Sequence, residues 1–348
     1  MTRDVRRVVV RPPNWLGDAV MSLAAIAAIR EHFRDAQLTI AAVPSVAPLF
    51  REDVDARPDR VIDLPVPTRD AAAALEGGGF DLAILFPNSF RSAWQLRRAG
   101  IPERWGYARA GRRWLLTRRS TPPPVAGPVH QADDYRRLVV GLGIECAEGA
   151  TPRLAARSPS AERARAILAQ RGIDPTTRLV GFAPGAAYGM AKQWPPDRVA
   201  EVIARLVNET DATAVVVGAS HDRDAARAIE SWLRANSPGS LSRVVDLTGQ
   251  TSLGGLIGLV ERMTTFVSND SGAMHLAAAM GRPVVAIFGP TDERRTRPLG
   301  DHAVLLDPVF CRPCMLRDCP IDHRCMKRIS VDAVEQAVRG RLSDAGVQ

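Results

Sequence analysis

Short runs of apolar, mostly β-branched residues alternate with longer segments whose apolar residues recur at helical spacing. In the first half of the chain the expected strands are Val8–Val10, Leu38–Val43, Val61–Leu64 and Leu82–Phe86. Helices are expected over residues 19–33 and 131–142. This alternation is typical of parallel strands joined by crossover helices, and the unbroken apolar run at 82–86 favours a sheet covered on both faces.

A second series of the same kind follows residue 160. Its expected strands are 179–183, 212–217, 244–247, 265–268 and 284–288, and its expected helices are 196–208, 222–236, 252–261 and 271–280. Prolines at 122–124 predict that residues 117–130 hold no regular structure, and 147–160 is the best linker candidate. We therefore predict an α/β protein with two doubly wound domains, 1–155 and 156–348, facing a central cleft. The last helix is a candidate for packing back on the first domain.

Composition excludes several classes of protein. Hydrophobic residues make up 46% of the 348 and charged residues 24%, which argues against disorder. The longest nearly apolar stretch, 19–29, is much shorter than the ~20 residues of a membrane-spanning helix. The apolar run at the basic start ends after three valines at Arg11-Pro12-Pro13, so no secretory signal is expected. The odd number of cysteines, five, also argues against a disulfide scaffold, and we expect a reduced, cytoplasmic protein.

Asp18 stands where the first strand gives way to a helix, in the segment Asn14-Trp15-Leu16-Gly17-Asp18. Ligands of doubly wound sheets bind beyond the carboxyl ends of the strands, so this turn is a candidate site. Asp18 could be a general base that activates a hydroxyl nucleophile, with Gly17 allowing a substrate close to the backbone. The alternative is a helix cap or first-turn acid that only interacts with the helix dipole.

The loop after the strand 179–183 contains Gly185, Ala187 and Lys192. Small residues there let backbone N–H groups approach an anion, and Lys192 adds a point charge. The loop is not a P-loop, because no Gly-Lys pair follows Gly185 at the required spacing. The alternative is that Lys192 is a solvated loop residue.

A strand followed by Asn269-Asp270-Ser271-Gly272-Ala273-Met274-His275 is the strongest local signal. The N–H groups of Ser271, Gly272 and Ala273 would point out of the helix start and could hold a phosphate. Asp270 could instead be only a helix cap, and His275 only a core histidine. A second small polar loop, 289–292, ends the next strand, and two such loops side by side favour a nucleotide site.

Three ordered motifs carry a resemblance to the ADP-heptose:lipopolysaccharide heptosyltransferases. They are Pro13-Asn-Trp-Leu-Gly-Asp18, the segment from Pro184-Gly185 to Lys192-Gln-Trp-Pro195, and Asn269-Asp-Ser-Gly-Ala-Met-His275. The resemblance spans nearly the whole chain. The segments Asn88–Ala93, Ala99–Pro102 and Cys311–Pro320 look more like heptosyltransferase II than heptosyltransferase I.

The resemblance implies a GT-B architecture, in which the first Rossmann-like domain binds the acceptor and the second the nucleotide-sugar. It also implies inverting, metal-independent transfer of heptose from ADP-L-glycero-β-D-manno-heptose to the lipopolysaccharide inner core, most simply the second heptose onto the first, with no cofactor. Asp18 matches the proposed catalytic base of the family, and Lys192 matches a lysine near the donor diphosphate. Asp270, Ser271, Gly272, Ala273 and His275 match its ADP-binding motif. Ala187 departs from relatives that carry a hydroxyl residue there.

The net charge of +8 implies anionic partners. The positions of the basic residues along the chain indicate which anionic partners to expect. Between Arg91 and Arg119 the chain has nine arginines and a single acid, Glu103. Guanidinium groups suit phosphates and carboxylates, which the Kdo and lipid A parts of an inner-core acceptor offer. The expected acceptor-binding residues are Asn88, Arg91, Arg97, Arg98, Arg112 and Arg113. The alternatives are a solvated basic face without a specific ligand, or attraction of that face to the anionic inner membrane. Without a recognition-helix or RNP-like motif, nucleic acid is not an expected partner.

Four cysteines follow the spacing C-x2-C-x4-C-x5-C at Cys311, Cys314, Cys319 and Cys325. This spacing is tighter than that of zinc ribbons, so reduced thiols packing a C-terminal turn are favoured over a structural metal site.

Two other classes of function stay open on the residues alone. One is a GT-B glycosyltransferase or epimerase with a different nucleotide-sugar, which could dispense with Asp18. The other is a nonenzymatic nucleotide-sensing or membrane-docking protein, which the joint presence of Asp18, Lys192 and the 270–275 motif disfavours. A Rossmann dehydrogenase is disfavoured because no G-x-G-x-x-G motif follows Val8–Val10.

Overall fold

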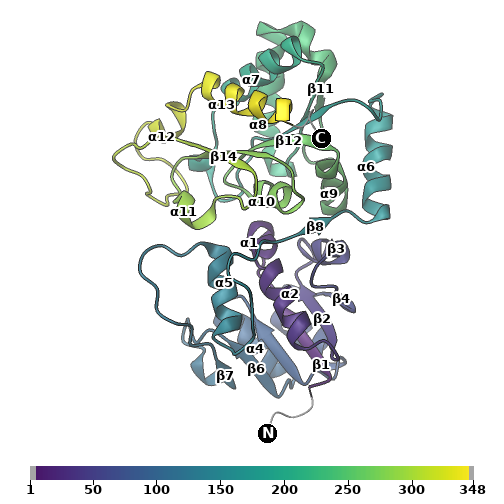
Figure 1. Cartoon of the computed structure of the whole chain (residues 1–348), viewed down its shortest axis with the longest axis vertical. Coiled ribbons are helices and arrows are strands. Elements are labelled where there is room, and N and C mark those ends of the chain that lie inside the picture. Colours follow the sequence, from purple (N-terminus) through teal and green to yellow (C-terminus); the bar gives the residue numbers. More distant parts are fainter. Residues whose placement is uncertain (1–4, 345–348) are drawn as a thin grey trace. The chain divides into compact units, whose positions relative to one another are not determined.

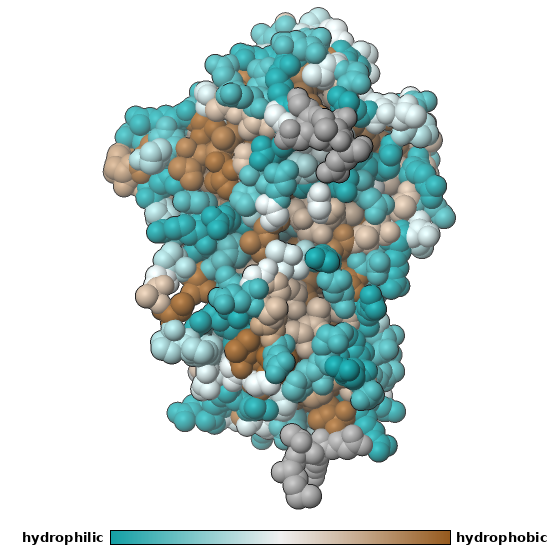
Figure 2. Space-filling view, in the orientation of Figure 1, coloured by the Kyte–Doolittle hydropathy of each residue, from teal (hydrophilic) through white to brown (hydrophobic). Residues whose placement is uncertain are grey.

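The computed structural model describes residues 5–344 and divides into two compact units, Met1–Leu154 and Ala155–Gln348. The division lies one residue before the expected one. Each unit has a sheet of six parallel strands with helices packed on its faces (Figure 1). Figure 2 shows that hydrophilic residues cover most of the visible surface, with hydrophobic residues in scattered groups.

The sheet of unit 1 has the order β4-β2-β1-β5-β6-β7. Its strands are β1 (Arg7–Arg11), β2 (Gln37–Ala42), β4 (Arg60–Asp63), β5 (Leu82–Leu85), β6 (Glu103–Gly106) and β7 (Arg118–Arg119). A separate two-stranded sheet pairs β3 (Asp53–Val54) with β8 (Leu154–Ala155). The strand order of the main sheet reverses between β1 and β5, where doubly wound sheets form a crevice at the carboxyl edge.

Helices cover both faces of the unit 1 sheet. On one face α5 (Gln131–Val140) packs against α1 (Leu16–Met21) and α2 (Leu23–His32). On the other, α3 (Thr68–Glu76) packs against α4 (Phe90–Arg98), and their apolar residues join Val9, Ala83 and Leu85 in one core cluster. The short 3-10 helices are η1 (Ala47–Arg51) and η2 (Arg113–Leu115). This two-sided cover explains why β5 is apolar throughout.

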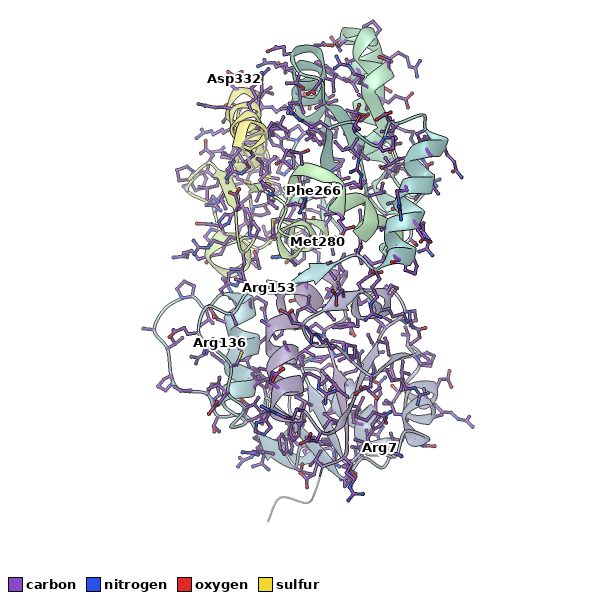
Figure 3. All side chains as sticks on the ribbon, turned by 45° about the vertical axis from the view of Figure 1, so that its right-hand side comes forward. Arg7, Arg136, Arg153, Phe266, Met280 and Asp332 are labelled. Atoms are coloured by element: carbon purple, nitrogen blue, oxygen red, sulfur yellow. The ribbon has the colours of Figure 1, made fainter. Side chains whose placement is uncertain are left out.

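The sheet of unit 2 has the equivalent order, β11-β10-β9-β12-β13-β14. Its strands are β9 (Leu179–Ala183), β10 (Thr213–Val216), β11 (Val244–Asp246), β12 (Met263–Asn269), β13 (Val284–Phe288) and β14 (His302–Leu306). The order reverses between β9 and β12, so the loops after these two strands flank the expected crevice. Phe266, which is fully buried on β12, lies inside this unit (Figure 3).

One face of the unit 2 sheet carries α7 (Pro196–Glu209), α8 (Arg223–Asn236) and α13 (Val331–Asp344), which share a core with Val180, Phe182 and Val216. The last helix packs on α7 and on β12, β13 and β14. The other helices and 3-10 helices are α6 (Ser158–Gln170), α9 (Leu253–Glu261), α10 (Gly272–Ala279), α11 (Glu293–Thr296), α12 (Arg324–Lys327), η3 (Met190–Lys192), η4 (Ser220–Asp222) and η5 (Pro238–Arg243).

The expected strands and helices are present, with two differences. The helix expected over 19–33 is divided at Ser22, whose hydroxyl donates to the carbonyl of Ala19 at 2.8 Å. The prediction of no regular structure over 117–130 was wrong at Arg118–Arg119, because that pair forms an edge strand beside β6 before the proline run begins. Among the residues described, no helix is both long and apolar enough to span a bilayer.

Helices α6 and α9 approach each other unusually closely, because α9 has Gly258 at the contact. A Cβ added to Gly258 would lie 2.1 Å from the carbonyl oxygen of Ser160 and 2.9 Å from the Cβ of Ala164. These neighbours belong to α6 itself, and two of the three contacted atoms are backbone, so they cannot rotate away. The glycine is therefore required by packing.

We expect Gly258→Ala to lower the free energy of unfolding of unit 2 by about 2 kcal/mol or more, because the methyl group forces the two helices apart. The matched control is Gly340→Ala in α13, where an added Cβ meets nothing within 4 Å. That change should be neutral or stabilise by up to about 1 kcal/mol, since alanine favours the helix. Urea unfolding of both variants measures the difference, and equal effects would contradict the packing argument.

Candidate active site

Asp18 lies in the first turn of α1, directly beyond the carboxyl end of β1. The helix is capped by Trp15 without any side-chain hydrogen bond, so Asp18 is not the cap. One carboxylate oxygen, Oδ1, accepts a hydrogen bond of 2.9 Å from the hydroxyl of Tyr135. This half-buried carboxylate is thus held by a side chain that is 117 positions away along the chain.

Tyr135 was missed by sequence reasoning, since no local motif marks it. It lies on α5, is 7% exposed, and its ring packs against that of Phe86 with centroids 5.6 Å apart. Burial, followed by the negative charge of Asp18, raises the pKa of Tyr135 well above its ordinary value. The hydroxyl is therefore a hydrogen-bond donor to the Asp18 carboxylate. The next residue along α5, Arg136, is marked in Figure 3.

The loop after β5 contains Asn88 and is held by Arg112. The guanidinium of Arg112 is fully buried and donates to the carbonyls of Tyr107 (2.9 Å) and Pro87, and to Oγ of Ser92 at 3.3 Å. It also donates to Oδ1 of Asn88 at 3.4 Å. Burial, and then the charge of Arg109, lowers the pKa of Arg112 to about 10. The expectation that Arg112 contacts the acceptor was wrong, because its donors are used within the protein.

The other predicted acceptor arginines, Arg91, Arg97, Arg98 and Arg113, are exposed. None of the four forms an ion pair with a residue that the structure describes. Arg91 also lies close enough to Arg11 for its charge to add to the effect of burial, which together lower the pKa of Arg11 to about 10. The surface around α4 and η2 is therefore rich in uncompensated positive charge.

In unit 2 the loops after β9 and β12 are joined by Asn269. Its amide nitrogen Nδ2 donates to the carbonyls of Pro184 (2.7 Å) and Gly185 (3.3 Å), and its Oδ1 accepts from the backbone N–H of Trp194 at 3.2 Å. Asn269 is 2% exposed, so these bonds are shielded from water. They fix the segment that carries Lys192 beside the start of α10.

Lys192 and Asp270 form a partly buried ion pair. Nζ of Lys192 lies 2.6 Å from Oδ2 of Asp270, and the side chains are 13% and 5% exposed. The same ammonium approaches the carbonyl oxygen of Asp270 at 3.4 Å and the ring of Tyr188 at 4.7 Å from its centroid. The alternative of a freely solvated lysine is therefore wrong, because its charge is balanced at the helix start.

Ser271 caps α10, since its hydroxyl accepts from the N–H of Met274 at 3.4 Å and pairs with Oγ of Ser268 at 2.9 Å. Gly272 and Ala273 follow in the first turn, half-buried, and His275 is buried at 5% exposure. The cap of this helix is Ser271, and Asp270 is the partner of Lys192.

Two buried hydroxyl groups stand near this edge of the sheet without a protein partner. Thr248 and Thr291 follow β11 and β13, and neither Oγ1 has a hydrogen bond to any residue in the described part of the chain. Buried orphan hydroxyls are uncommon and call for an explanation, such as a ligand.

Gly185 lacks a side chain for a reason that differs from the expected one. A Cβ there would lie 2.1 Å from Oδ1 of Asp222, so the glycine accommodates the carboxylate of Asp222. Ala187, two residues on, is exposed and is the position where we expected departure from relatives.

The model of Glycosyltransferase family 9 (heptosyltransferase) matches residues 69–324. The chain belongs to this family. It is 29% identical to lipooligosaccharide heptosyltransferase 2 of Haemophilus ducreyi over 322 residues, covering 86% of this chain and 88% of that protein. It is also 29% identical to lipopolysaccharide heptosyltransferase 2 of Escherichia coli, covering 85% and 86%.

The solved structure of E. coli ADP-heptose LPS heptosyltransferase II superposes on this chain with a TM-score of 0.82 at 26% identity, covering 98% of this chain and all of that one. A family 9 glycosyltransferase from Veillonella parvula shares the fold, with a TM-score of 0.81 at 19% identity. The expected GT-B architecture, the expected family and the expectation of a glycosyltransferase are confirmed.

In this family 9 glycosyltransferase a C-terminal segment, residues 311–323, braces the loop that carries Lys192. The hydroxyl of Tyr188 donates to the carbonyl of Met315 at 2.8 Å, and the N–H of Ala191 donates to the carbonyl of Arg317 at 2.9 Å. Nε2 of His323 lies 2.7 Å from the carbonyl oxygen of Ala191. We call residues 311–323 the brace. The sequence marked this segment by its cysteines, by His323 among them and by its resemblance to heptosyltransferase II, but did not predict its contacts with the Lys192 loop.

The brace also holds the loop after β13. Arg312, 9% exposed at its side chain, donates to the carbonyls of Gly289 (2.9 Å) and Thr291 (3.0 Å) and pairs with Glu293 at 2.8 Å. Cys325 is buried, whereas Cys314 and Cys319 are exposed. Within residues 5–344, no three His, Cys, Asp or Glu side chains are arranged to hold a metal ion. Cys311, Cys314 and Cys319 belong to the brace, which both main-chain and side-chain contacts hold in place, and Cys325 follows it in α12.

We expect Lys192→Met and Asp270→Asn each to lower the free energy of unfolding by about 2–4 kcal/mol, because each leaves one partly buried partner unpaired. The double variant should recover most of that loss, giving a coupling energy measurable by a double-mutant cycle in urea. The control is the exposed pair Arg51–Asp63, whose side chains are 44% and 51% exposed. Arg51→Met should cost less than about 1 kcal/mol. If the double variant lost the sum of the two single losses in free energy of unfolding, the pairing of Lys192 with Asp270 would be contradicted.

Proposed function

We propose that this glycosyltransferase moves heptose from ADP-L-glycero-β-D-manno-heptose to the lipopolysaccharide inner core with inversion, adding the second heptose to the first. The observation that carries the proposal is the ion pair of Lys192 and Asp270 at the start of α10, because it puts a cation beside the N–H groups of the helix turn. The relatives named heptosyltransferase 2, and the solved structure named for ADP-heptose, support the donor and the acceptor class.

The donor's diphosphate is expected at the carboxyl edge of the unit 2 sheet. The first-turn N–H groups of α10 and the ammonium of Lys192 would stabilise the negative charge that collects on the departing ADP. The Lys192 ammonium has three N–H donors, and Asp270 and the ring of Tyr188 occupy its surroundings, so the diphosphate would share the lysine with Asp270. The orphan hydroxyls of Thr248 and Thr291 are further donors for this ligand.

Asp18 is the proposed base. Its carboxylate would take the proton of the acceptor hydroxyl while that oxygen forms a bond to the anomeric carbon. The bond from that carbon to the phosphate oxygen breaks with its electron pair, through an oxocarbenium-like state, and ADP leaves. The hydrogen bond from Tyr135 supports this role, because it orients the carboxylate and favours its ionised form.

The acceptor is expected on unit 1. The exposed guanidiniums of Arg91, Arg97, Arg98 and Arg113 suit the carboxylate of Kdo and the phosphates of lipid A. Asn88, positioned by Arg112 beside them, is the remaining polar candidate. Arg112 itself contributes by ordering this loop. Peripheral contact with the cytoplasmic face of the inner membrane is part of the proposal, since this acceptor is a lipid.

The proposed function is tested with ADP-heptose and lipopolysaccharide acceptors truncated to a defined length. Wild-type enzyme should transfer heptose only to the acceptor ending in one heptose, and UDP- or GDP-sugars should not compete with ADP-heptose. Asp18→Ala should lose turnover by about 10²–10⁴-fold because the base is gone, while its affinity for ADP stays within about twofold.

The matched control is Asp70→Ala, which removes another first-turn acid of a unit 1 helix. That variant should keep wild-type turnover. If Asp18→Ala keeps wild-type turnover, Asp18 is not the catalytic base. If the enzyme uses another nucleotide-sugar efficiently, the alternative of a different GT-B transferase or epimerase is favoured.

Tyr135→Phe should move the acidic limb of the kcat/KM profile to higher pH by about half to one unit. The sign follows because the hydroxyl donates to the ionised carboxylate, so its loss raises the pH at which Asp18 becomes a base. Tyr107→Phe is the control, since the Tyr107 hydroxyl donates to the carbonyl of Asp134 at 2.9 Å and does not contact Asp18. If the pH profile of Tyr135→Phe superimposes on that of the wild type, Tyr135 does not act on the proposed base.

A further inference from the structure

Three aromatic rings gather on the surface of unit 1, and no step of the proposed reaction uses them. Phe90, Trp94 and Trp114 are 43%, 37% and 58% exposed. Their ring centroids are 6.4 Å apart for Phe90 and Trp94, 5.7 Å for Phe90 and Trp114, and 6.5 Å for Trp94 and Trp114. We call these three residues the ring patch. Each ring touches both of the others, so the patch is one contiguous apolar surface.

The secondary structure explains why the rings face outward together. Phe90 and Trp94 are four positions apart on α4, where side chains share one face, and the opposite face of that helix buries Ala93 and Leu96 in the core. Trp114 comes from η2, whose buried residue is Leu115. Both elements therefore bury other residues in the core, and the three rings lie on their solvent-facing sides.

The buried side chain of Arg112 holds together the two elements that carry the ring patch. This buried guanidinium lies next to η2 in sequence and donates to Pro87 and Ser92, around the start of α4. A second buried guanidinium, Arg104, donates to the carbonyl of Leu115 at 2.7 Å. The two elements that carry the rings are thus tied together by hydrogen bonds from buried guanidinium groups. The patch exists before any partner arrives.

Positive charge surrounds the rings. Arg91, Arg97 and Arg98 lie on α4 and Arg113 on η2, all exposed, and none is in an ion pair among the residues described. Glu103, the only acid between Arg91 and Arg119, accepts hydrogen bonds from Trp105 and Thr117. A partner that covers the patch must therefore accept apolar rings and supply several negative charges.

We propose that the ring patch and its arginines dock this enzyme on an anionic lipid bilayer, with the rings at headgroup depth. Tryptophan suits that depth, because its ring is apolar and its N–H stays hydrated, and arginines beside it attract acidic headgroups. The inference deepens the membrane contact in the proposed function by assigning it to named residues. It does not depend on Asp18 or Lys192, so the two can fail separately.

Vesicle flotation tests the proposal with the full chain. The wild type should bind vesicles of phosphatidylcholine with 30% phosphatidylglycerol at least about tenfold more tightly than pure phosphatidylcholine, and 0.5 M salt should weaken that binding. The double variant Trp94→Ser/Trp114→Ser should bind the anionic vesicles about tenfold less tightly. Its thermal unfolding and ADP binding should stay at wild-type values, which excludes misfolding. Bromine-labelled lipids should quench tryptophan fluorescence in the wild type and less in this variant.

The control is Phe310→Ser on unit 2, which removes a more exposed aromatic, 79% exposed, outside the ring patch. It should bind vesicles like the wild type. On a deacylated, water-soluble acceptor the double variant should turn over at the wild-type rate, whereas on the same acceptor embedded in anionic vesicles it should be about tenfold slower. Loss of turnover on both acceptors would point to an acceptor-binding role and overturn the docking role.

Three other outcomes also overturn the proposal. If the double variant binds anionic vesicles as tightly as the wild type, the rings do not dock on lipid. If the wild type forms a dimer in sedimentation that the double variant loses, the patch binds a second copy of this chain. If the wild type binds an oligonucleotide through the same rings in preference to vesicles, the patch binds nucleic acid.

Discussion

A parallel sheet brings the carboxyl ends of all its strands to one edge, and that constraint decides which distant residues of this chain can meet. Both six-stranded sheets are parallel throughout, and each reverses its strand order beside the first strand of its unit. In unit 2 the loops after β9 and β12 therefore come together, although they are more than 70 residues apart in the sequence. Asn269 converts this proximity into a fixed geometry through three shielded hydrogen bonds.

Positively charged side chains occupy three different environments in the molecule. Arg104 and Arg112 are buried and give their donors to backbone carbonyls, so their charges serve to order loops. Lys192 is partly buried against a carboxylate, so it stays available at a site that would be costly for an unpaired cation. The remaining arginines around α4 stay in water, where their charge can act on partners. The same residue type thus has a structural or a recognition role according to its burial.

Hydrophobic periodicity was sufficient to predict the alternating fold, because buried parallel strands such as β5 and β9 leave an unmistakable apolar run. It also located Asp18, Lys192 and Asp270, since strand ends are visible in sequence. Periodicity could not predict the hydrogen bond from Tyr135 to Asp18, because that contact depends on how α5 packs against α1. It could not separate Arg112 from Arg113 either, since adjacent residues of one type differ only in which side of η2 they face.

The brace supports the loops around Lys192 with main-chain atoms as well as with the side chains of Arg312 and His323. Three of its contacts with the loops around Lys192 use main-chain atoms of the brace: the carbonyls of Met315 and Arg317, and the N–H of Met315, which donates to the carbonyl of Pro290 at 2.9 Å. Any residue but proline supplies those groups, so substitutions at 315 and 317 can keep these three bonds, whereas a deletion there would shift all three together. The length of this segment is therefore more tightly constrained by the structure than the identity of residues 315 and 317.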